Sequence, residues 1–231
     1  MRSGMYRVSM AGALLCGAMA SSVSAAIVTQ DLFARTGPLI GSAPTTGSGT
    51  WSNVGGGAGD YNTDGSQLVM GAGRFASLPV SALPRNSVIT LSGDVNANGG
   101  GENWTVIGFT DHGHFFEEGE LRLFLRNNTG LSGPTGDFTT NKSAGNLKMV
   151  IVTPLAGDPN PNTYQTTVFL DGVQYGGTAS VTKGIGFMTL GSNVGNTTYD
   201  NFTLDITAVP EPAMAGVLGL AGMVLTRRRS R

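Results

Sequence analysis

The amino-acid sequence predicts an all-β protein whose antiparallel strands form a jelly-roll sandwich. Three observations support this fold class. Glycine occupies 36 of the 231 positions, about twice its usual share of about 7%. Short runs of β-forming residues alternate with Gly, Asn, Asp or Pro, and no long segment has the 3.6-residue period of an amphipathic helix. The chain is 40% hydrophobic and only 13% charged, which favours a packed core over disorder.

Residues 1–25 have the features of a secretory signal peptide. Two arginines within the first seven residues supply a positive n-region, residues 8–20 form an apolar segment, and residues 23–25 (Val-Ser-Ala) are small enough for cleavage. A membrane anchor would need a longer apolar run. The only cysteine, Cys16, lies in this segment. We therefore expect a mature chain without disulfides, stabilised by its core alone.

Residues 26–207 are assigned to one sandwich domain with many short strands. The expected strands cover residues 67–70, 75–78, 87–94, 104–110, 121–126, 146–153, 165–170, 186–191 and 199–206. Alternation is clearest where Leu121, Leu123 and Leu125 alternate with Arg122, Phe124 and Arg126. Asp171-Gly172, between two β-rich runs, predicts a hairpin with a type I′ turn, because both central residues of that turn need positive φ.

Residues 208–231 form a C-terminal tail with three parts in order. These are Pro210, Glu211 and Pro212, then an apolar run over residues 213–226, then Arg227, Arg228 and Arg229. As a helix the 14 apolar residues extend about 21 Å, less than the hydrocarbon core of about 30 Å. We therefore expect a short apolar helix that holds the exported chain at the membrane briefly, with the arginines on the cytoplasmic side. The two prolines keep the preceding segment extended and accessible to a processing enzyme.

This ordered arrangement resembles the PEP-CTERM sorting signal of Gram-negative and related bacteria. The resemblance implies recognition by an exosortase-type membrane transpeptidase, cleavage near the motif, and release or attachment at the cell surface. Pro210, Glu211 and Pro212 would then be a motif read by that enzyme and not a catalytic site. The alternative is an ordinary C-terminal anchor that contains the tripeptide by chance.

Two further segments carry a resemblance within the sandwich domain. Residues 167–173 read Thr-Val-Phe-Leu-Asp-Gly-Val, and residues 199–204 read Tyr-Asp-Asn-Phe-Thr-Leu. Their order along the chain resembles the concanavalin A-like (laminin G-like) sandwich of lectins and glucanases. The resemblance implies a two-sheet fold and only loosely implies carbohydrate binding, because this fold hosts many functions.

Both histidines of the chain, His112 and His114, lie in one acidic segment. On a strand, His-X-His would place both rings on one face as metal ligands, and Glu117, Glu118 and Glu120 could add oxygen ligands or act as acid and base. We favour a solvated loop over this metal site. Related glucanases carry their carboxylates on a Glu-X-Asp-X-X-Glu strand, and this pattern is absent. We therefore expect no enzyme, with a secreted glycoside hydrolase as the alternative.

A second candidate metal site is a calcium loop. Asp60, Asn62, Asp64 and the following glycine match the first half of such a loop, in which alternate side chains supply oxygen ligands. The bidentate Glu expected six residues after that glycine is replaced by Gly71. Calcium binding and a hydrated Asx turn are the two interpretations left open.

Glycan binding would require exposed aromatic rings that stack on sugars. Trp51, Tyr61, Trp104 and Tyr164 are the candidates. Trp104 begins an apolar strand, which favours a core position, whereas Trp51 lies in a segment rich in Gly, Ser and Asn. We therefore choose Trp51 and Tyr61 as the glycan-binding candidates.

The charge of the sandwich domain narrows its partners. Without the six arginines of the two ends and Glu211, eight basic and fourteen acidic residues remain, a net charge of about −6. An acidic surface repels the phosphate backbone, so we expect no nucleic-acid partner. We expect a non-catalytic, lectin-like protein of the cell surface or extracellular matrix that contacts polysaccharide or has a structural role.

Overall fold

The computed structural model describes residues 26–54, 57–81, 83–98, 103–113, 120–127 and 129–209. The predicted signal peptide, the Pro-Glu-Pro motif with its apolar segment and arginines, and His114, Glu117 and Glu118 lie outside the described residues. The described chain forms sixteen β-strands and one short 3₁₀ turn, η1 (Ala58–Asp60). No helix in this part of the chain is long and apolar enough to cross a membrane.

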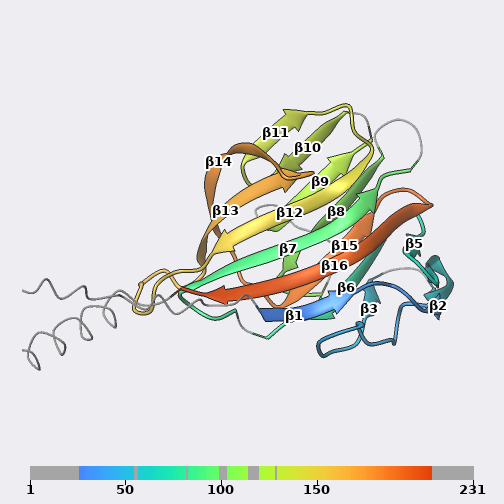
Figure 1. Cartoon of the computed structure of the whole chain (residues 1–231), viewed down its shortest axis with the longest axis horizontal. Coiled ribbons are helices and arrows are strands. Elements are labelled where there is room, and N and C mark those ends of the chain that lie inside the picture. The colour runs from blue at the N-terminus through green and yellow to red at the C-terminus, as the bar shows by residue number, and fades with distance from the viewer. Residues whose placement is uncertain are drawn as a thin grey trace, which may run out of the picture.

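Nine of these strands form one antiparallel sheet (Figure 1). Its order is β14 (Val173–Thr182), β13 (Thr163–Leu170), β12 (Ala144–Val152), β7 (Ser87–Asn96), β16 (Thr197–Ala208), β5 (Leu68–Met70), β4 (Tyr61–Asp64) and β2 (Thr36–Pro38). The first strand, β1 (Ala26–Asp31), pairs with the last strand, β16, so that Ala26 lies opposite Ile206. The two ends of the described chain are therefore neighbours.

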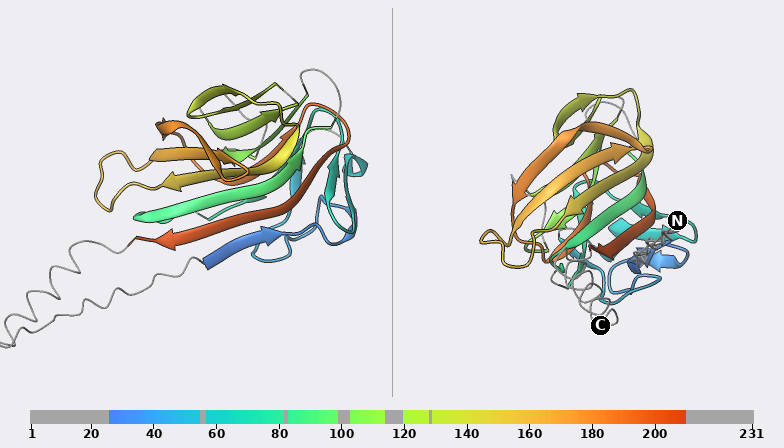
Figure 2. Two further views of the ribbon diagram at one scale, coloured as in Figure 1. Left: turned by 45° about the horizontal axis from the view of Figure 1, so that its top comes forward. Right: turned by 60° about the vertical axis from the view of Figure 1, so that its left-hand side comes forward.

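The other seven strands form a second antiparallel sheet. Its order is β11 (Gly136–Thr139), β10 (Gly130–Gly133), β9 (Leu121–Arg126), β8 (Trp104–Thr110), β15 (Phe187–Ser192), β6 (Arg74–Pro79) and β3 (Ser52–Val54). The two sheets pack face to face as a sandwich (Figure 2). The predicted all-β, antiparallel sandwich is confirmed.

Alternation along the strands builds the core between the sheets. Leu121, Leu123 and Leu125 of β9 are buried, whereas the intervening Arg122 and Phe124 are partly exposed, as the sequence predicts. These leucines belong to one buried apolar cluster to which both sheets contribute. Because buried apolar surface contributes about 25 cal/mol per Å² to stability, this cluster is the main stabilising element of a domain without disulfides.

The predicted hairpin between β13 and β14 is also confirmed. Leu170 pairs with Val173 across a two-residue turn, and Asp171 and Gly172 have φ angles of +50° and +79°. Both angles lie in the left-handed region that a type I′ turn requires, which Asp tolerates and Gly adopts without strain.

The strands of the seven-stranded sheet have one face toward the core and one away from it. Thr105 of β8 points inward, since its Oγ1 donates a 2.6 Å hydrogen bond to the hydroxyl of Tyr199 in the opposite sheet. Ile107 and Phe109 follow with the same phase and belong to the core. Trp104 and Val106 therefore belong to the opposite face, called here the outer face.

Candidate functional site

Three aromatic rings gather on the outer face. The ring of Trp104 meets that of Phe124 edge-on, with centroids 5.1 Å apart and an interplanar angle of 90°. Phe75 of β6 lies on its other side, with a centroid distance of 6.1 Å. All three side chains are partly exposed. We call Phe75, Trp104 and Phe124 the aromatic platform.

The strand register and one glycine position this platform. Val106 of β8 pairs with Phe124 on one side and with Gly191 on the other, and Gly191 pairs in turn with Phe75. A Cβ atom at Gly191 would lie 2.4 Å from the Phe75 ring. The missing side chain therefore lets the Phe75 ring lie over β15, beside Trp104.

A polar pocket of about 210 Å³ lies next to the platform. Its lining comes from β9, β10, β11 and the turn before β10, and consists of Arg126, Thr129, Gly130, Leu131, Ser132, Asp137, Phe138 and Thr139. Arg126 pairs with Trp104 in the sheet, which joins pocket and platform. The lining offers a guanidinium, a carboxylate and three hydroxyls beside an aromatic surface. This combination suits a polyhydroxylated ligand.

A second cluster occupies the opposite end of the same strands, where β8 ends and β9 begins. Ligand atoms of Asp111, His112 and Glu120 all lie within 4.8 Å of one another. His112 Nδ1 is hydrogen-bonded to Asp111 Oδ1 and lies 3.8 Å from Glu120 Oε1. The hydrogen bond from His112 lowers the pKa of Asp111, while partial burial acts in the opposite direction. The Glu120 side chain is only 1% exposed.

An imidazole nitrogen and two carboxylates are a donor set that zinc or another divalent metal accepts. The sequence proposed His112 and His114 for such a site. The structure brings Asp111 and Glu120 to His112, and His114 lies outside the described residues. The carboxylates of Asp111 and Glu120 could also act together without a metal, because retaining glycosidases hold their two catalytic carboxylates about 5–5.5 Å apart.

The predicted calcium residues have local partners. Asp60 ends η1, where its Oδ2 accepts a 2.9 Å hydrogen bond from Arg74 Nε. Asp64 Oδ1 accepts the backbone N–H groups of Ser66 and Gln67, and these hydrogen bonds lower its pKa to about 2. Asn62 is exposed on β4 between them. The contacts of Asp64 are those of an Asx turn, and calcium binding by Asp60, Asn62 and Asp64 stays a prediction.

The two aromatic residues chosen for glycan binding are in the core, and that prediction is wrong. Trp51 is 1% exposed and Tyr61 is 0% exposed, so neither ring can stack on a sugar. Burial of Tyr61 raises the pKa of its hydroxyl. Tyr164, the weaker candidate, is also buried. The sequence predicts Trp104 in the core because it begins an apolar strand, but its side chain is half-buried on the outer face.

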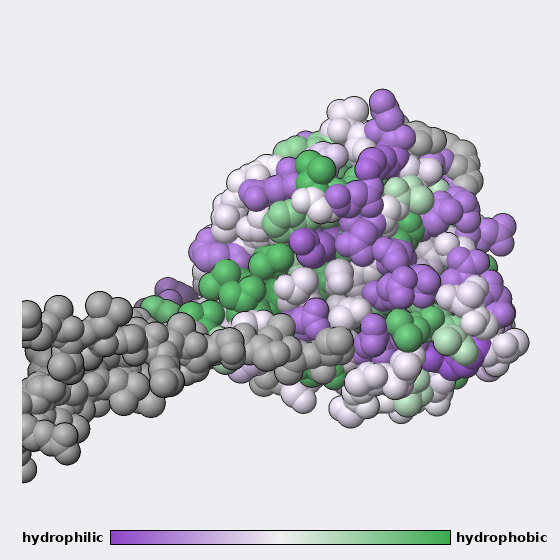
Figure 3. Space-filling view, viewed as in Figure 1, coloured by the Kyte–Doolittle hydropathy of each residue, from purple (hydrophilic) through white to green (hydrophobic). Residues whose placement is uncertain are grey.

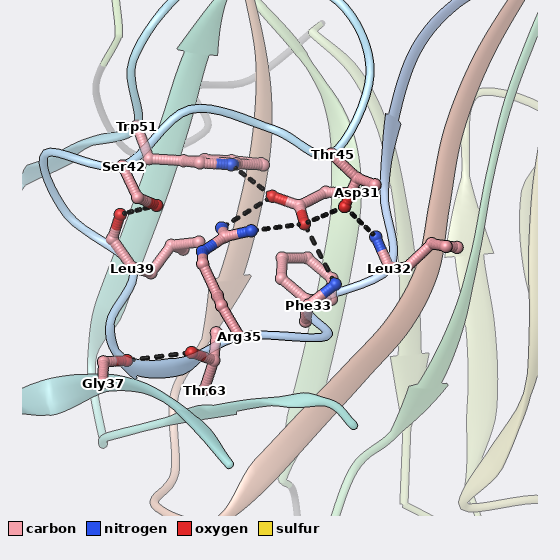
Figure 4. Close-up of polar contacts among 10 residues, drawn as sticks. All are labelled: Asp31, Leu32, Phe33, Arg35, Gly37, Leu39, Ser42, Thr45, Trp51 and Thr63. Atoms are coloured by element: carbon pink, nitrogen blue, oxygen red, sulfur yellow. Dashed lines mark hydrogen bonds and ion pairs between the residues drawn. The ribbon is translucent and has the colours of Figure 1, made fainter. Parts of the chain in front are cut away.

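Trp51 can be buried because a carboxylate twenty residues earlier in the sequence accepts a hydrogen bond from its indole N–H (Figure 4). Its Nε1 donates a 2.8 Å hydrogen bond to Asp31 Oδ2, and Asp31 is fully buried. Arg35 donates to both oxygens of this carboxylate at 2.8 Å, and the backbone N–H of Phe33 donates at 2.9 Å. We call Asp31, Arg35 and Trp51 the Asp31 cluster. It joins β1, the loop after it and the segment before β3.

The comparisons with known proteins bear on the fold. No family model and no curated protein matches the chain. Among solved structures, endo-1,3-β-glucanase from Streptomyces sioyaensis aligns with a TM-score of 0.52 at 11% identity, over 80% of this chain and 97% of the glucanase. Trypanosoma rangeli sialidase aligns at 0.49 and 12% identity, over 77% of this chain and 30% of that one. The metal-free exoplasmic/lumenal domain of VIP36 aligns at 0.46 and 8% identity, over 81% and 95%.

At these identities the comparison shows the fold alone. The described chain shares the architecture of the glucanase over almost the whole length of that enzyme. The chain is therefore similar to the glucanase as a two-sheet antiparallel sandwich.

Proposed function

We propose that this chain is an exported cell-surface or extracellular-matrix protein whose sandwich binds polysaccharide without cleaving it, through the outer face of the seven-stranded sheet. The observation that carries the proposal is the aromatic platform beside the polar pocket, joined by the Trp104–Arg126 pair. The likeness to a glucanase supports it as a likeness of fold.

The chemistry of the site fits a sugar better than a nucleic acid. An aromatic ring stacks on the apolar face of a pyranose, while hydroxyls, a guanidinium and a carboxylate bond to its equatorial hydroxyls. Arg122 lies over Phe124 with 5.2 Å between Cζ and the ring centroid, which adds a second guanidinium to the polar groups beside the platform. The net charge of about −6 over the middle of the chain opposes a nucleic acid.

The chain offers a matched pair of variants for the test. Phe124→Ala removes a platform ring beneath Arg122. Phe169→Ala removes a similarly half-buried strand ring, beneath Lys148 at 4.3 Å, from the nine-stranded sheet. We expect Phe124→Ala to weaken binding in a glycan array about tenfold, equivalent to about 1.4 kcal/mol, and Phe169→Ala to leave it unchanged. If the unaltered protein binds no glycan on the array, with or without calcium, the lectin-like proposal is refuted and a structural role is left.

A glycoside hydrolase is the second candidate, favoured by the proximity of Asp111 and Glu120. Binding is preferred because the aromatic platform and the polar pocket lie at the other end of β8 and β9 from these two carboxylates, and because the sequence lacks the Glu-X-Asp-X-X-Glu strand of the related glucanases. Release of reducing sugar from a bound glycan, abolished by Glu120→Gln, would reverse this preference. Binding without release supports the lectin-like role.

The sorting of the protein is proposed from its tail. Pro210, Glu211 and Pro212 would be recognised by an exosortase-type membrane transpeptidase after export, and the apolar segment would hold the chain at the membrane until cleavage. Replacing the three residues by alanine should leave uncleaved protein in the membrane fraction of the producing cell. Normal processing of that variant would refute the sorting proposal.

A further inference from the structure

The end of the sandwich from which the tail departs is held close to any membrane that the tail enters. The described chain ends at Val209, and only Pro210, Glu211 and Pro212 separate it from the apolar segment over residues 213–226. Four Cα–Cα steps span at most about 13–14 Å. If the apolar segment is in the bilayer, Val209 must therefore lie within about that distance of its surface.

This same end carries exposed apolar side chains. Leu155 is 63% exposed, Val152 44% and Val209 40%, and these are three of the five exposed large hydrophobic residues in the described chain. Figure 3 shows hydrophobic residues gathered over the ends of β12, β7 and β16, at the left of the view. We call Leu155, Val152 and Val209 the end patch.

Asn86 fixes the end patch relative to the departing tail. Its backbone O accepts a 2.6 Å hydrogen bond from Val209 N, and its backbone N donates to Pro154 O at 3.1 Å. Its side-chain Oδ1 accepts from Ala156 N at 3.2 Å. The loop that carries Leu155 and the last residue before the tail are therefore bonded to one residue, which adopts a φ of +53° to reach both.

A cation accompanies the end patch. Arg85 is exposed, and its Nη1 lies 3.4 Å from the backbone O atoms of Leu155 and Asp158. A guanidinium next to exposed apolar side chains is the pattern of interfacial membrane contacts, in which the apolar groups enter the headgroup boundary and the cation meets anionic lipid.

We propose that the end patch is a membrane-seating surface, and that the sandwich rests with this end on the bilayer while the tail is inserted. The inference rests on the proposed insertion of the tail. A lipid surface fits better than a second copy of the chain, because three side chains cover far less than the about 800 Å² per partner of a stable interface. The short connection to residue 213 also brings the bilayer to the patch.

The test uses the full chain with Cys16→Ser and one new cysteine, either Leu155→Cys or Val173→Cys, labelled with an environment-sensitive dye. Val173 is the matched control because it is 59% exposed but follows the Asp171-Gly172 turn, at the other end of β13 from the Leu155 loop. Eight residues of β13 separate the two ends, which corresponds to about 26 Å at about 3.3 Å per residue.

Each labelled chain is incorporated into vesicles of phosphatidylcholine and phosphatidylglycerol, with and without nitroxide-labelled lipid. We expect flotation of both, a blue shift of the dye at residue 155, and quenching at least twofold stronger there than at residue 173. Flotation with equal quenching at the two positions overturns the seating surface while tail insertion stands. Failure to float overturns both insertion and seating, and glycan binding is unaffected by either result.

Discussion

Replacing Asp31 by alanine should destabilise the sandwich more than any exposed acidic substitution. Asp31 is fully buried and accepts hydrogen bonds from Trp51 Nε1, from both terminal nitrogens of Arg35, and from the Phe33 backbone N–H. Phe33 has a φ of +49°, in the region that non-glycine residues rarely adopt. The carboxylate therefore stabilises an unfavourable backbone conformation as well as a buried indole.

The magnitude follows from the groups left behind. A buried donor that loses its acceptor costs about 1–3 kcal/mol, and both the Trp51 indole and the Phe33 amide would be in that position. Breaking a fully buried ion pair costs about 3–5 kcal/mol, but the Arg35 side chain is 27% exposed and can reach water. We therefore expect a loss of about 4 kcal/mol, a large share of a total of about 5–15 kcal/mol.

Urea denaturation followed by tryptophan fluorescence measures this loss. At about 2 kcal/mol per molar urea, the midpoint of Asp31→Ala should fall by about 2 M. Asp158→Ala is the control, since Asp158 is exposed and accepts one local hydrogen bond from Asn160 N. The double variant Asp31→Leu, Arg35→Met should recover part of the loss, because it leaves no unpaired charge. A midpoint for Asp31→Ala within 0.5 M (about 1 kcal/mol) of the control would refute the reasoning.

Three further outcomes are expected. Burial raises the pKa of Asp205, so the charged form of this residue opposes folding. Asp205→Asn should therefore raise Tm at pH 7, and the gain should vanish below about pH 3.9, which is the pKa of Asp in the unfolded chain. Calorimetry at both pH values can check this. Gly191→Ala would place a Cβ 2.4 Å from the Phe75 ring and should weaken glycan binding, whereas normal affinity would show that Phe75 is not part of the site. Tyr199→Phe removes the acceptor of a buried 2.6 Å hydrogen bond from Thr105; we expect a cost of about 1–3 kcal/mol in urea denaturation, and an unchanged midpoint would contradict it.

The sequence predicts strands best where side chains alternate over a long run. The strands expected at 104–110 and 121–126 have the same bounds as β8 and β9. The paired strands β10 and β11 are not predicted, because Gly130–Gly133 and Gly136–Thr139 are only four residues long each and contain three glycines between them. Pairing with β9 and a φ of +121° at Gly136 make them a hairpin. Such pairing is a tertiary effect that no local propensity records.

The candidate site shows the same limit. The polar neighbours of Trp51 in the sequence suggested exposure, but its environment is set by Asp31, twenty residues earlier. The outer aromatic platform had a usable signal. If Leu121, Leu123 and Leu125 point inward, then Phe124 must point outward, and an outward phenylalanine between two arginines is a candidate ligand contact.

The pairing of β1 with β16 has a consequence for the order of folding. Ala26 and Ile206 are neighbours in the sheet although about 180 residues separate them in the chain, and β16 also lies between β7 and β5. A chain that emerges from a ribosome or a secretion channel with its N-terminus first has β1 long before it has the partner of β1. Closing so long a loop is entropically costly and slow. The nine-stranded sheet cannot be completed until the last strand has emerged. The chain therefore lacks its complete native sandwich for almost the whole of its synthesis, and during that time it can still pass through a secretion channel before it is fully folded.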